Sequence, residues 1–125
     1  MGLEKPIQDA IMWEFSTRAD MRLWRANAGA AEYEDPKTGQ TRMVRFGTPG
    51  QADLSGLLND GTRLEIEVKA PGRMQSIQQR NFQNMINDFG GIYILAYSVD
   101  DVYRILIQEG YIKDRSAHGS NGDQS

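Results

Sequence analysis

The chain has 125 residues, no cysteine and a formal net charge of −3 at pH 7. This length predicts one domain with a single hydrophobic core, and the lack of cysteine excludes disulfides, zinc–thiolate sites and thiol nucleophiles. A net negative charge argues against a protein that coats nucleic acid by charge alone. Neither an apolar run of membrane-spanning length nor a signal-peptide pattern is present, so we expect a cytoplasmic protein with no membrane partner.

The first predicted element is a helix from residue 4 to about residue 19. Its apolar residues keep helical spacing: Ile7, Ile11 and Phe15. Glu4 lies near the same face and could turn toward the sheet as a supplementary acid of a site. The alternative is an acidic residue stabilised by the helix dipole in the first turn. Glu14 is a second, weaker candidate for the same role.

Three short strands are predicted next, at residues 22–28, 31–33 and 42–46. The segment 34–39, Glu-Asp-Pro-Lys-Thr-Gly, has proline and glycine where a turn needs them and should join the second strand to the third. A glycine-flanked loop at 47–50 then leads toward Asp53. Such loops let the backbone approach a ligand closely, although most are simple connections.

Two further strands are joined by a tight turn that ends at Gly61. If the turn has three residues, with Gly61 in the left-handed conformation, Leu54 lies opposite Ile66 and Asp53 lies opposite Glu67. A two-residue turn would shift the register by one and move Asp53 to the other face. The apolar pairing of Leu54 with Ile66 favours the three-residue turn.

In the second of these strands, apolar residues alternate with Glu65, Glu67 and Lys69. Charges on one face of a strand are ordinarily solvated, so the alternation alone is weak evidence of a site. Asp53 opposite Glu67 is stronger evidence, because directly opposed Cβ atoms are about 5 Å apart and two like charges there are destabilising. A hard divalent cation with oxygen ligands, most plausibly magnesium, would remove that repulsion.

The remaining chain predicts a helix, a strand and a second helix. Ser76 and Gln79 form a capping box at the start of the first helix. The apolar run 92–97 predicts a central strand buried on both faces, parallel to the preceding strand. Ser98 and Asp101 predict another capping box. We expect one domain at 1–113 and a disordered polar tail at 114–125, which makes the single histidine, His118, a poor catalytic candidate.

These motifs resemble a known family. Asp53 followed by Glu67-Val68-Lys69 matches the D…(D/E)-x-K signature of the restriction-endonuclease-like nucleases. The G-x-x-D-L-x-G around Asp53 and the S-x-x-Q-x-x-F from Ser76 resemble the virus-type replication-repair nuclease (VRR-NUC) branch. The W-R-A-N-A-G from Trp24 is similar to phage-encoded members. The resemblance covers about residues 4 to 107, and the ordered series of motifs is more specific than any one of them.

The resemblance implies an α/β protein with a restriction-endonuclease-like core, in which helices flank a mixed central sheet. It implies Mg²⁺-dependent hydrolysis of phosphodiester bonds in DNA, with Mn²⁺ as a substitute metal and no organic cofactor. The products would carry 5′-phosphate and 3′-hydroxyl ends. It also implies a homodimer that cuts branched DNA such as Holliday junctions. The implied catalytic residues are Asp53, Glu67, Lys69, Gln79 and Glu4, and the implied metal ligands are Asp53, Glu67 and the carbonyl of Val68.

Arginines are concentrated in the first two thirds of the chain. Arginine suits phosphate contacts, and we predict a nucleic-acid interface that includes Arg25, Asn27, Arg45 and Arg73. A solvated basic surface is the alternative explanation. Two other functions remain open for the chain as a whole: a non-catalytic nucleic-acid-binding module on the same fold, or an accessory subunit of a larger phage assembly.

Overall fold

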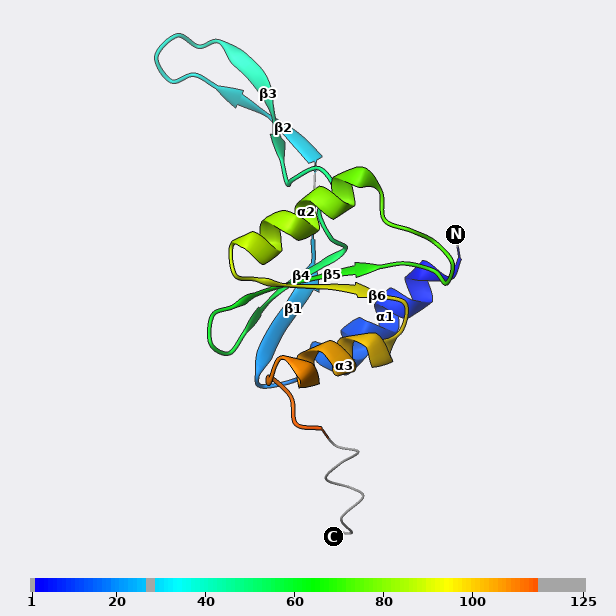
Figure 1. Cartoon of the computed structure of the whole chain (residues 1–125). Coiled ribbons are helices and arrows are strands. Elements are labelled where there is room, and N and C mark those ends of the chain that lie inside the picture. The colour runs from blue at the N-terminus through cyan, green and yellow to red at the C-terminus, as the bar shows by residue number, and fades with distance from the viewer. Residues whose placement is uncertain (1, 27–28, 115–125) are drawn as a thin grey trace, which may run out of the picture.

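Figure 1 shows the computed structural model of the chain, which describes residues 2–26 and 29–114. Within these residues, three helices pack against a mixed four-stranded sheet, and a two-stranded hairpin stands apart. The helices are α1 (Glu4–Phe15), α2 (Ile77–Asp88) and α3 (Val99–Gln108). The strands are β1 (Met21–Arg25), β2 (Gly29–Glu34), β3 (Thr41–Phe46), β4 (Leu54–Leu58), β5 (Arg63–Val68) and β6 (Ile92–Ala96). The sheet order is β1-β4-β5-β6, and β2 pairs with β3.

The two faces of the sheet are covered by different helices (Figure 1). Because side chains alternate along a strand, each strand sends one set of residues to each face. One set packs with α1 and α3 into the main core: Met21, Leu23, Leu54, Leu58, Leu64, Ile66, Val68, Ile94 and Ala96. The other face carries α2, whose Phe82 and Ile86 pack against Ala52 and Tyr93.

The register of the β4–β5 hairpin is the predicted one. Leu54 pairs with Ile66, and the amide of Leu58 donates to the carbonyl of Thr62 at 2.9 Å across the turn. Gly61 has a φ of +89°, as a three-residue turn with a left-handed last residue requires. The register, continued by one residue beyond Leu54–Ile66, sets Asp53 beside Glu67.

We expect Gly61→Ala to destabilise the protein through backbone conformation alone. A Cβ at this position would meet nothing within 4 Å, but the φ of +89° is strained for any residue with a side chain. The free energy of unfolding should fall by about 1–2 kcal/mol. Chemical denaturation measures this effect. Asn59→Ala in the same turn is the control, and an equal loss there would contradict this explanation.

Strand β6 differs from its prediction in position. It pairs with β5 in parallel, as predicted, with Ile66 beside Ile94. It is, however, an edge strand of the described sheet and not a central one. Its continuous apolar run is explained by the helices, because α2 covers Tyr93 on one face while Ile94 and Ala96 enter the main core on the other.

The helix starts follow their capping residues. At α2 the predicted capping box is confirmed, since the side chains of Ser76 and Gln79 each accept an amide hydrogen bond from the other residue. At α3 the box is only half formed. The Ser98 hydroxyl accepts from the Asp101 amide at 3.3 Å, but the Asp101 carboxylate accepts from the amide of Tyr97, at 2.8 Å.

Two boundaries in the first part of the chain are shorter than predicted. Helix α1 ends at Phe15, with Ser16 as its C-cap, and not near residue 19; Arg18 and Asp20 form an ion pair at 2.9 Å in the turn before β1. Strand β1 ends at Arg25; the predicted continuation at residues 27–28 lies outside the described residues, as do residue 1 and the segment 115–125 with His118.

The β2–β3 hairpin projects away from the four-stranded sheet (Figure 1). Its predicted turn is present: the amide of Asp35 donates to the carbonyl of Gln40 at 2.8 Å, and Gly39 has a φ of +77°. Tyr33, Met43 and Val44 are exposed on the hairpin. None of the helices in the described part of the chain has the length and apolar character needed to cross a bilayer.

Candidate active site

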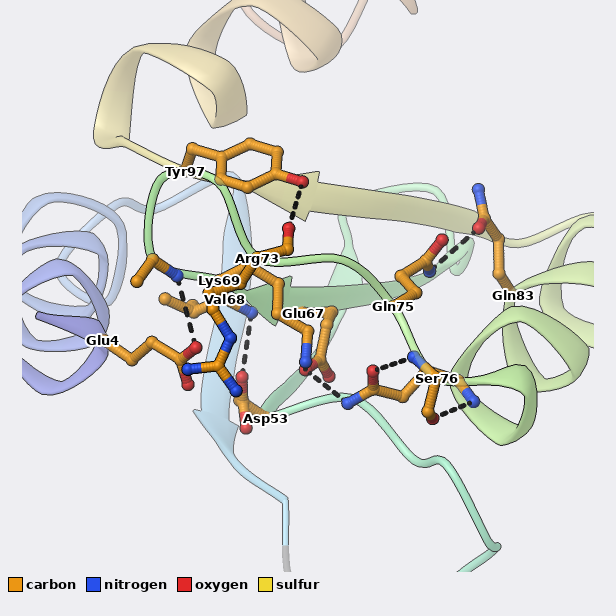
Figure 2. Close-up of polar contacts among 12 residues, drawn as sticks. Glu4, Asp53, Glu67, Val68, Lys69, Arg73, Gln75, Ser76, Gln83 and Tyr97 are labelled. Atoms are coloured by element: carbon orange, nitrogen blue, oxygen red, sulfur yellow. Dashed lines mark hydrogen bonds and ion pairs between the residues drawn. The ribbon is translucent and has the colours of Figure 1, made fainter. Parts of the chain in front are cut away.

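Asp53 and Glu67 lie side by side at the end of the β4–β5 hairpin that is opposite its turn (Figure 2). Asp53 directly precedes β4, and Glu67 is the penultimate residue of β5. Their backbones are held in register by the Leu54–Ile66 pair beside them. The carbonyl of Asp53 also accepts from the amide of Ala26 at 2.9 Å, which ties this position to the end of β1. The two carboxylates therefore lie on a rigid part of the molecule.

The Asp53 carboxylate is half-buried and is bound to the backbone of the neighbouring strand. Its Oδ2 accepts a hydrogen bond from the amide of Val68 at 2.8 Å. Burial raises the pKa of Asp53; the hydrogen bond from Val68 opposes that rise, and the charge of Glu4 adds to it. The Val68 amide thus fixes one carboxylate oxygen and favours the ionised form, which is the form a cation would need.

Glu67 is the most perturbed carboxylate of the site. Its side chain is 3% exposed; Oε2 accepts from Nε2 of Gln79 at 2.8 Å and lies 3.9 Å from Nζ of Lys69. Oε1 is buried and has no hydrogen-bond partner among the described residues. Burial raises the pKa of Glu67 to about 8; the charge of Asp53 acts in the same direction and that of Lys69 opposes it.

Glu65, two residues earlier on the same face of β5, provides an internal comparison. It is completely buried, yet the Ser55 hydroxyl donates to its Oε1 at 3.0 Å and the Arg63 guanidinium binds its Oε2 at 2.5 Å. Both of its oxygens are therefore satisfied within the protein. Glu67 has comparable burial but keeps one oxygen unpaired, and buried polar atoms of that kind are rare. The alternative of ordinary solvated charges on this face of β5 does not hold for these two residues, since both glutamates are buried.

Lys69 and the carbonyl of Val68 complete the predicted set on β5. The Lys69 side chain is only 13% exposed, so its ammonium is held beside Glu67 and is not free in solvent. Its amide donates to the carbonyl of Ala96 on β6. In a strand the amide and carbonyl of one residue point to the same side. Because the Val68 amide points to Asp53, the Val68 carbonyl also faces that side.

Gln79 links the cap of α2 to the carboxylate pair. Its side-chain oxygen accepts from the Ser76 amide at 2.9 Å, and its side-chain nitrogen donates to Glu67 at 2.8 Å (Figure 2). One amide group therefore closes the capping box and orients Glu67. The sequence motif alone explained only the first of these contacts.

The glycine-flanked loop before Asp53 approaches α2 closely. A Cβ on Gly50 would lie 2.1 Å from the backbone oxygen of Gln78 and 2.7 Å from the amide of Gln79. Only glycine permits this contact, and the φ of +78° at Gly50 also favours glycine. The close neighbour of this loop is thus the first turn of α2, and the contact helps to set the position of Gln79.

Glu4 lies at the same site, and Glu14 does not. The Glu4 carboxylate accepts from the amide of Ala70 at 3.2 Å, just past the end of β5, and its charge raises the pKa of both Asp53 and Glu67. Glu14 instead accepts a hydrogen bond from the Tyr103 hydroxyl on α3. Of the two acidic candidates on α1, Glu4 is the one beside the carboxylate pair.

The three predicted nucleic-acid contacts that lie within the described residues are not gathered in one place. Arg25 lies nearest: its guanidinium is 3.3 Å from Asp9 of α1, and it lines a hollow of about 290 Å³ that reaches Asp53. Arg73 is exposed in the loop after β5. Arg45 is exposed on β3 of the projecting hairpin. Asn27 lies outside the described residues.

Two tyrosines hold the loop that connects β5 to α2, and the sequence analysis did not single them out. The Tyr97 hydroxyl donates to the carbonyl of Arg73 at 3.0 Å (Figure 2). Gln75 donates to the Tyr93 hydroxyl at 3.1 Å and to Gln83 at 3.0 Å. Both tyrosines sit in an apolar run whose pattern signals only burial, so their loop contacts required the tertiary structure.

The donor set was tested for its fit to a divalent cation. Residues 2–26 and 29–114 contain no group of three or more acidic or histidine side chains arranged to hold a metal ion. A cation between Asp53 and Glu67 would have two carboxylates, the Val68 carbonyl and water as ligands. All of these are oxygen donors, as magnesium prefers. The unpaired Oε1 of Glu67 is the specific feature that a cation would satisfy.

Compared with models of protein families, with curated proteins and with solved structures, the chain matches none of them.

Proposed function

We propose that this protein is a metal-dependent endonuclease that hydrolyses phosphodiester bonds in DNA, with a restriction-endonuclease-like core of the VRR-NUC type. We further propose magnesium as the metal, a homodimer as the working unit and branched DNA as the substrate. Asp53, Glu67 and the Val68 carbonyl are the proposed ligands. Lys69, Gln79 and Glu4 complete the proposed site.

The single observation that carries the proposal is the unpaired oxygen of Glu67. A buried carboxylate with a pKa raised to about 8 and an unsatisfied oxygen is destabilising for a protein that uses it only as structure. Perturbed titratable groups of this kind are found preferentially at functional sites. Glu65 on the same strand is equally buried but has both oxygens bonded within the protein, so burial on β5 does not by itself explain the unpaired oxygen of Glu67.

The chain's own residues have distinct roles in this proposal. When bound, magnesium would withdraw charge from a phosphodiester oxygen and lower the pKa of a water molecule. Gln79 holds Glu67 in one orientation, and the Val68 amide does the same for Asp53. The Lys69 ammonium, beside the pair, can orient the attacking water or stabilise negative charge on the phosphate oxygens.

The second candidate is a nucleic-acid-binding module without catalysis. Its predicted basic contacts are spread over the chain, with Arg25 on β1, Arg45 on β3 and Arg73 in the loop after β5. In that case the Asp53–Glu67 pair would contribute to neither cleavage nor metal binding. An accessory subunit of a larger assembly remains the third possibility, and a self-sufficient active dimer would count against it.

The proposal is tested with the purified protein on a panel of DNA substrates: four-way junction, flap and blunt duplex. We expect cleavage of a branched substrate in Mg²⁺, none in EDTA, and products with 5′-phosphate ends. Asp53→Ala should abolish cleavage while DNA binding in EDTA persists. Wild-type binding without cleavage of any substrate, in Mg²⁺ or Mn²⁺, would favour the binding module.

A further inference from the structure

One half of the sheet face that carries the proposed site is not covered by a helix. Helix α2 packs over β6, where Phe82 and Ile86 meet Tyr93. Side chains alternate along β1 and β4, and every second residue enters the main core on the other face. The residues that point to the α2 side are therefore Arg22, Trp24, Ser55 and Leu57. Trp24 is 41% exposed and Leu57 is 44% exposed. Arg22 is also exposed.

We propose that this surface, formed by Arg22, Trp24, Leu57 and Arg63 and called here the Trp24 platform, binds an unpaired segment of the DNA substrate. Trp24 would stack against a base. Arg22 and Arg63 lie together in the next row of paired residues, on the side of Trp24 away from Asp53, and would contact the phosphates that follow. The inference rests on the proposed nuclease function for its substrate, and its binding step is independent of cleavage.

The register of the sheet connects the platform to the site. Trp24 pairs with Ser55, two residues along β4 from Asp53, which corresponds to about 7 Å. The side chains of Asp53 and Ser55 both point to the α2 side of the sheet, because Leu54 between them in the sequence points into the core. Trp24, as the partner of Ser55, points to the same side. A DNA strand bound across Asp53 and Glu67 can therefore continue onto the indole ring of Trp24 while it stays on the same face of the sheet.

The charges of the platform select a polyanion. Arg22 and Arg63 are the two charged side chains that reach solvent from β1, β4 and β5 on this face away from Asp53. Glu65, in the neighbouring row with Ser55 and Trp24, is buried and forms an ion pair with Arg63. The net positive charge of the platform therefore comes from Arg22, in a chain whose net charge is −3. The negatively charged phosphates of DNA complement the platform, whereas an acidic surface on another part of the chain would repel them.

An unpaired base fits the platform better than a base within a duplex. The faces of bases in a duplex are already stacked on their neighbours, whereas a single strand can place a base face on an exposed aromatic ring. Leu57 extends the apolar surface beside the ring. An aromatic ring with basic side chains nearby is the usual arrangement for binding single strands without reading their sequence.

The test measures binding of a fluorescein-labelled oligothymidine of about 15 nucleotides in EDTA, where no cleavage can occur. We expect Trp24→Ala to weaken binding about tenfold or more and Trp24→Phe to retain most of the affinity. Trp13→Ala is the matched control, because Trp13 is the other tryptophan, is 84% exposed and lies on α1 across the sheet. In a Trp13→Phe background, the oligonucleotide should quench the fluorescence of Trp24.

Several outcomes would overturn the platform. One is equal affinity of Trp24→Ala and wild type; another is an equal loss in Trp13→Ala. Sedimentation that shows a dimer dissociated by Trp24→Ala would assign the surface to a second copy of the chain. If Trp24→Ala does not fold, Arg22→Ala replaces it and should reduce the salt dependence of binding by about one ion; an unchanged slope would refute the proposal.

Failure of the platform and failure of the nuclease proposal are separable. Wild-type cleavage with unchanged binding by Trp24→Ala would remove the platform and leave the nuclease proposal intact. Binding that depends on Trp24, without cleavage of any substrate, would support the platform and refute the nuclease proposal.

Discussion

Glu67→Gln should abolish cleavage and at the same time make the metal-free protein more stable at pH 8. The pKa of Glu67 is raised from 4.5 to about 8 in the folded state, so the folded protein binds more protons than the unfolded chain between these values. The stability associated with this group is therefore fully present below pH 4.5 and is lost as pH rises toward 8. Glutamine carries no charge and should not show that loss.

The gain in the free energy of unfolding of Glu67→Gln over wild type should be near zero at pH 4.5 and about 4 kcal/mol at pH 8. Thermal or chemical denaturation at both pH values in EDTA measures it. Glu65→Gln is the matched control on the same strand face. Because it breaks the contacts of Glu65 with Arg63 and Ser55, it should destabilise the protein by about 1–3 kcal/mol. A gain for Glu67→Gln that is independent of pH would contradict our account of Glu67.

Metal provides a second readout of the same variant. A cation that binds ionised Glu67 stabilises the folded protein, and its effect on the free energy of unfolding grows with concentration. Mg²⁺ should therefore raise the melting temperature of the wild type at pH 8 and leave that of Glu67→Gln unchanged. Equal stabilisation of both proteins would place the metal away from Glu67.

Lys69→Ala should lower the single-turnover cleavage rate about 10²–10³-fold, the usual effect of removing one group that stabilises the charge of a transition state. Lys69 stands beside the carboxylate pair, 3.9 Å from Glu67, and is not one of the proposed ligands. Metal affinity should consequently change little. Lys113→Ala is the control, since Lys113 is exposed beyond α3 and should show wild-type rates.

The pH dependence separates two roles of Lys69. Its positive charge lowers the pKa of Glu67, so Lys69→Ala could weaken metal binding indirectly at neutral pH. Above pH 9 Glu67 is ionised in the wild type, and saturating Mg²⁺ should favour its ionised form in the variant as well. A rate deficit that persists there assigns Lys69 to the chemical step. If the deficit disappears, or if metal binding collapses in parallel with the rate, Lys69 acts by holding the site together.

Several parts of the fold that depend on near neighbours in the sequence were predicted correctly. Gly61 and the alternation on either side of it determined the turn length, and therefore the pairing of Leu54 with Ile66. Ser76 and Gln79 determined the start of α2. These features are local: a turn type needs a residue that tolerates positive φ, and a cap needs a hydroxyl three residues before an amide.

The features that required the tertiary structure are those that depend on which element covers which surface. Alternation on β5 predicted the faces of Glu65 and Glu67, but their burial depends on α2 and its loop. The apolar run of β6 indicated burial on both faces and led to a central strand, whereas two layers of helices bury an edge strand equally well. Periodicity records how many faces are buried and not what buries them.

The candidate site combines both kinds of information. The sequence by itself determined that Asp53 and Glu67 lie side by side, because the hairpin register is local. It did not determine that Glu67 Oε1 lacks a partner, or that Glu4 reaches the amide of Ala70, 66 residues away. Those facts arise from the packing of α1 and α2 around one end of the sheet, where desolvation by distant residues changes the pKa of a carboxylate that the local sequence would leave in water.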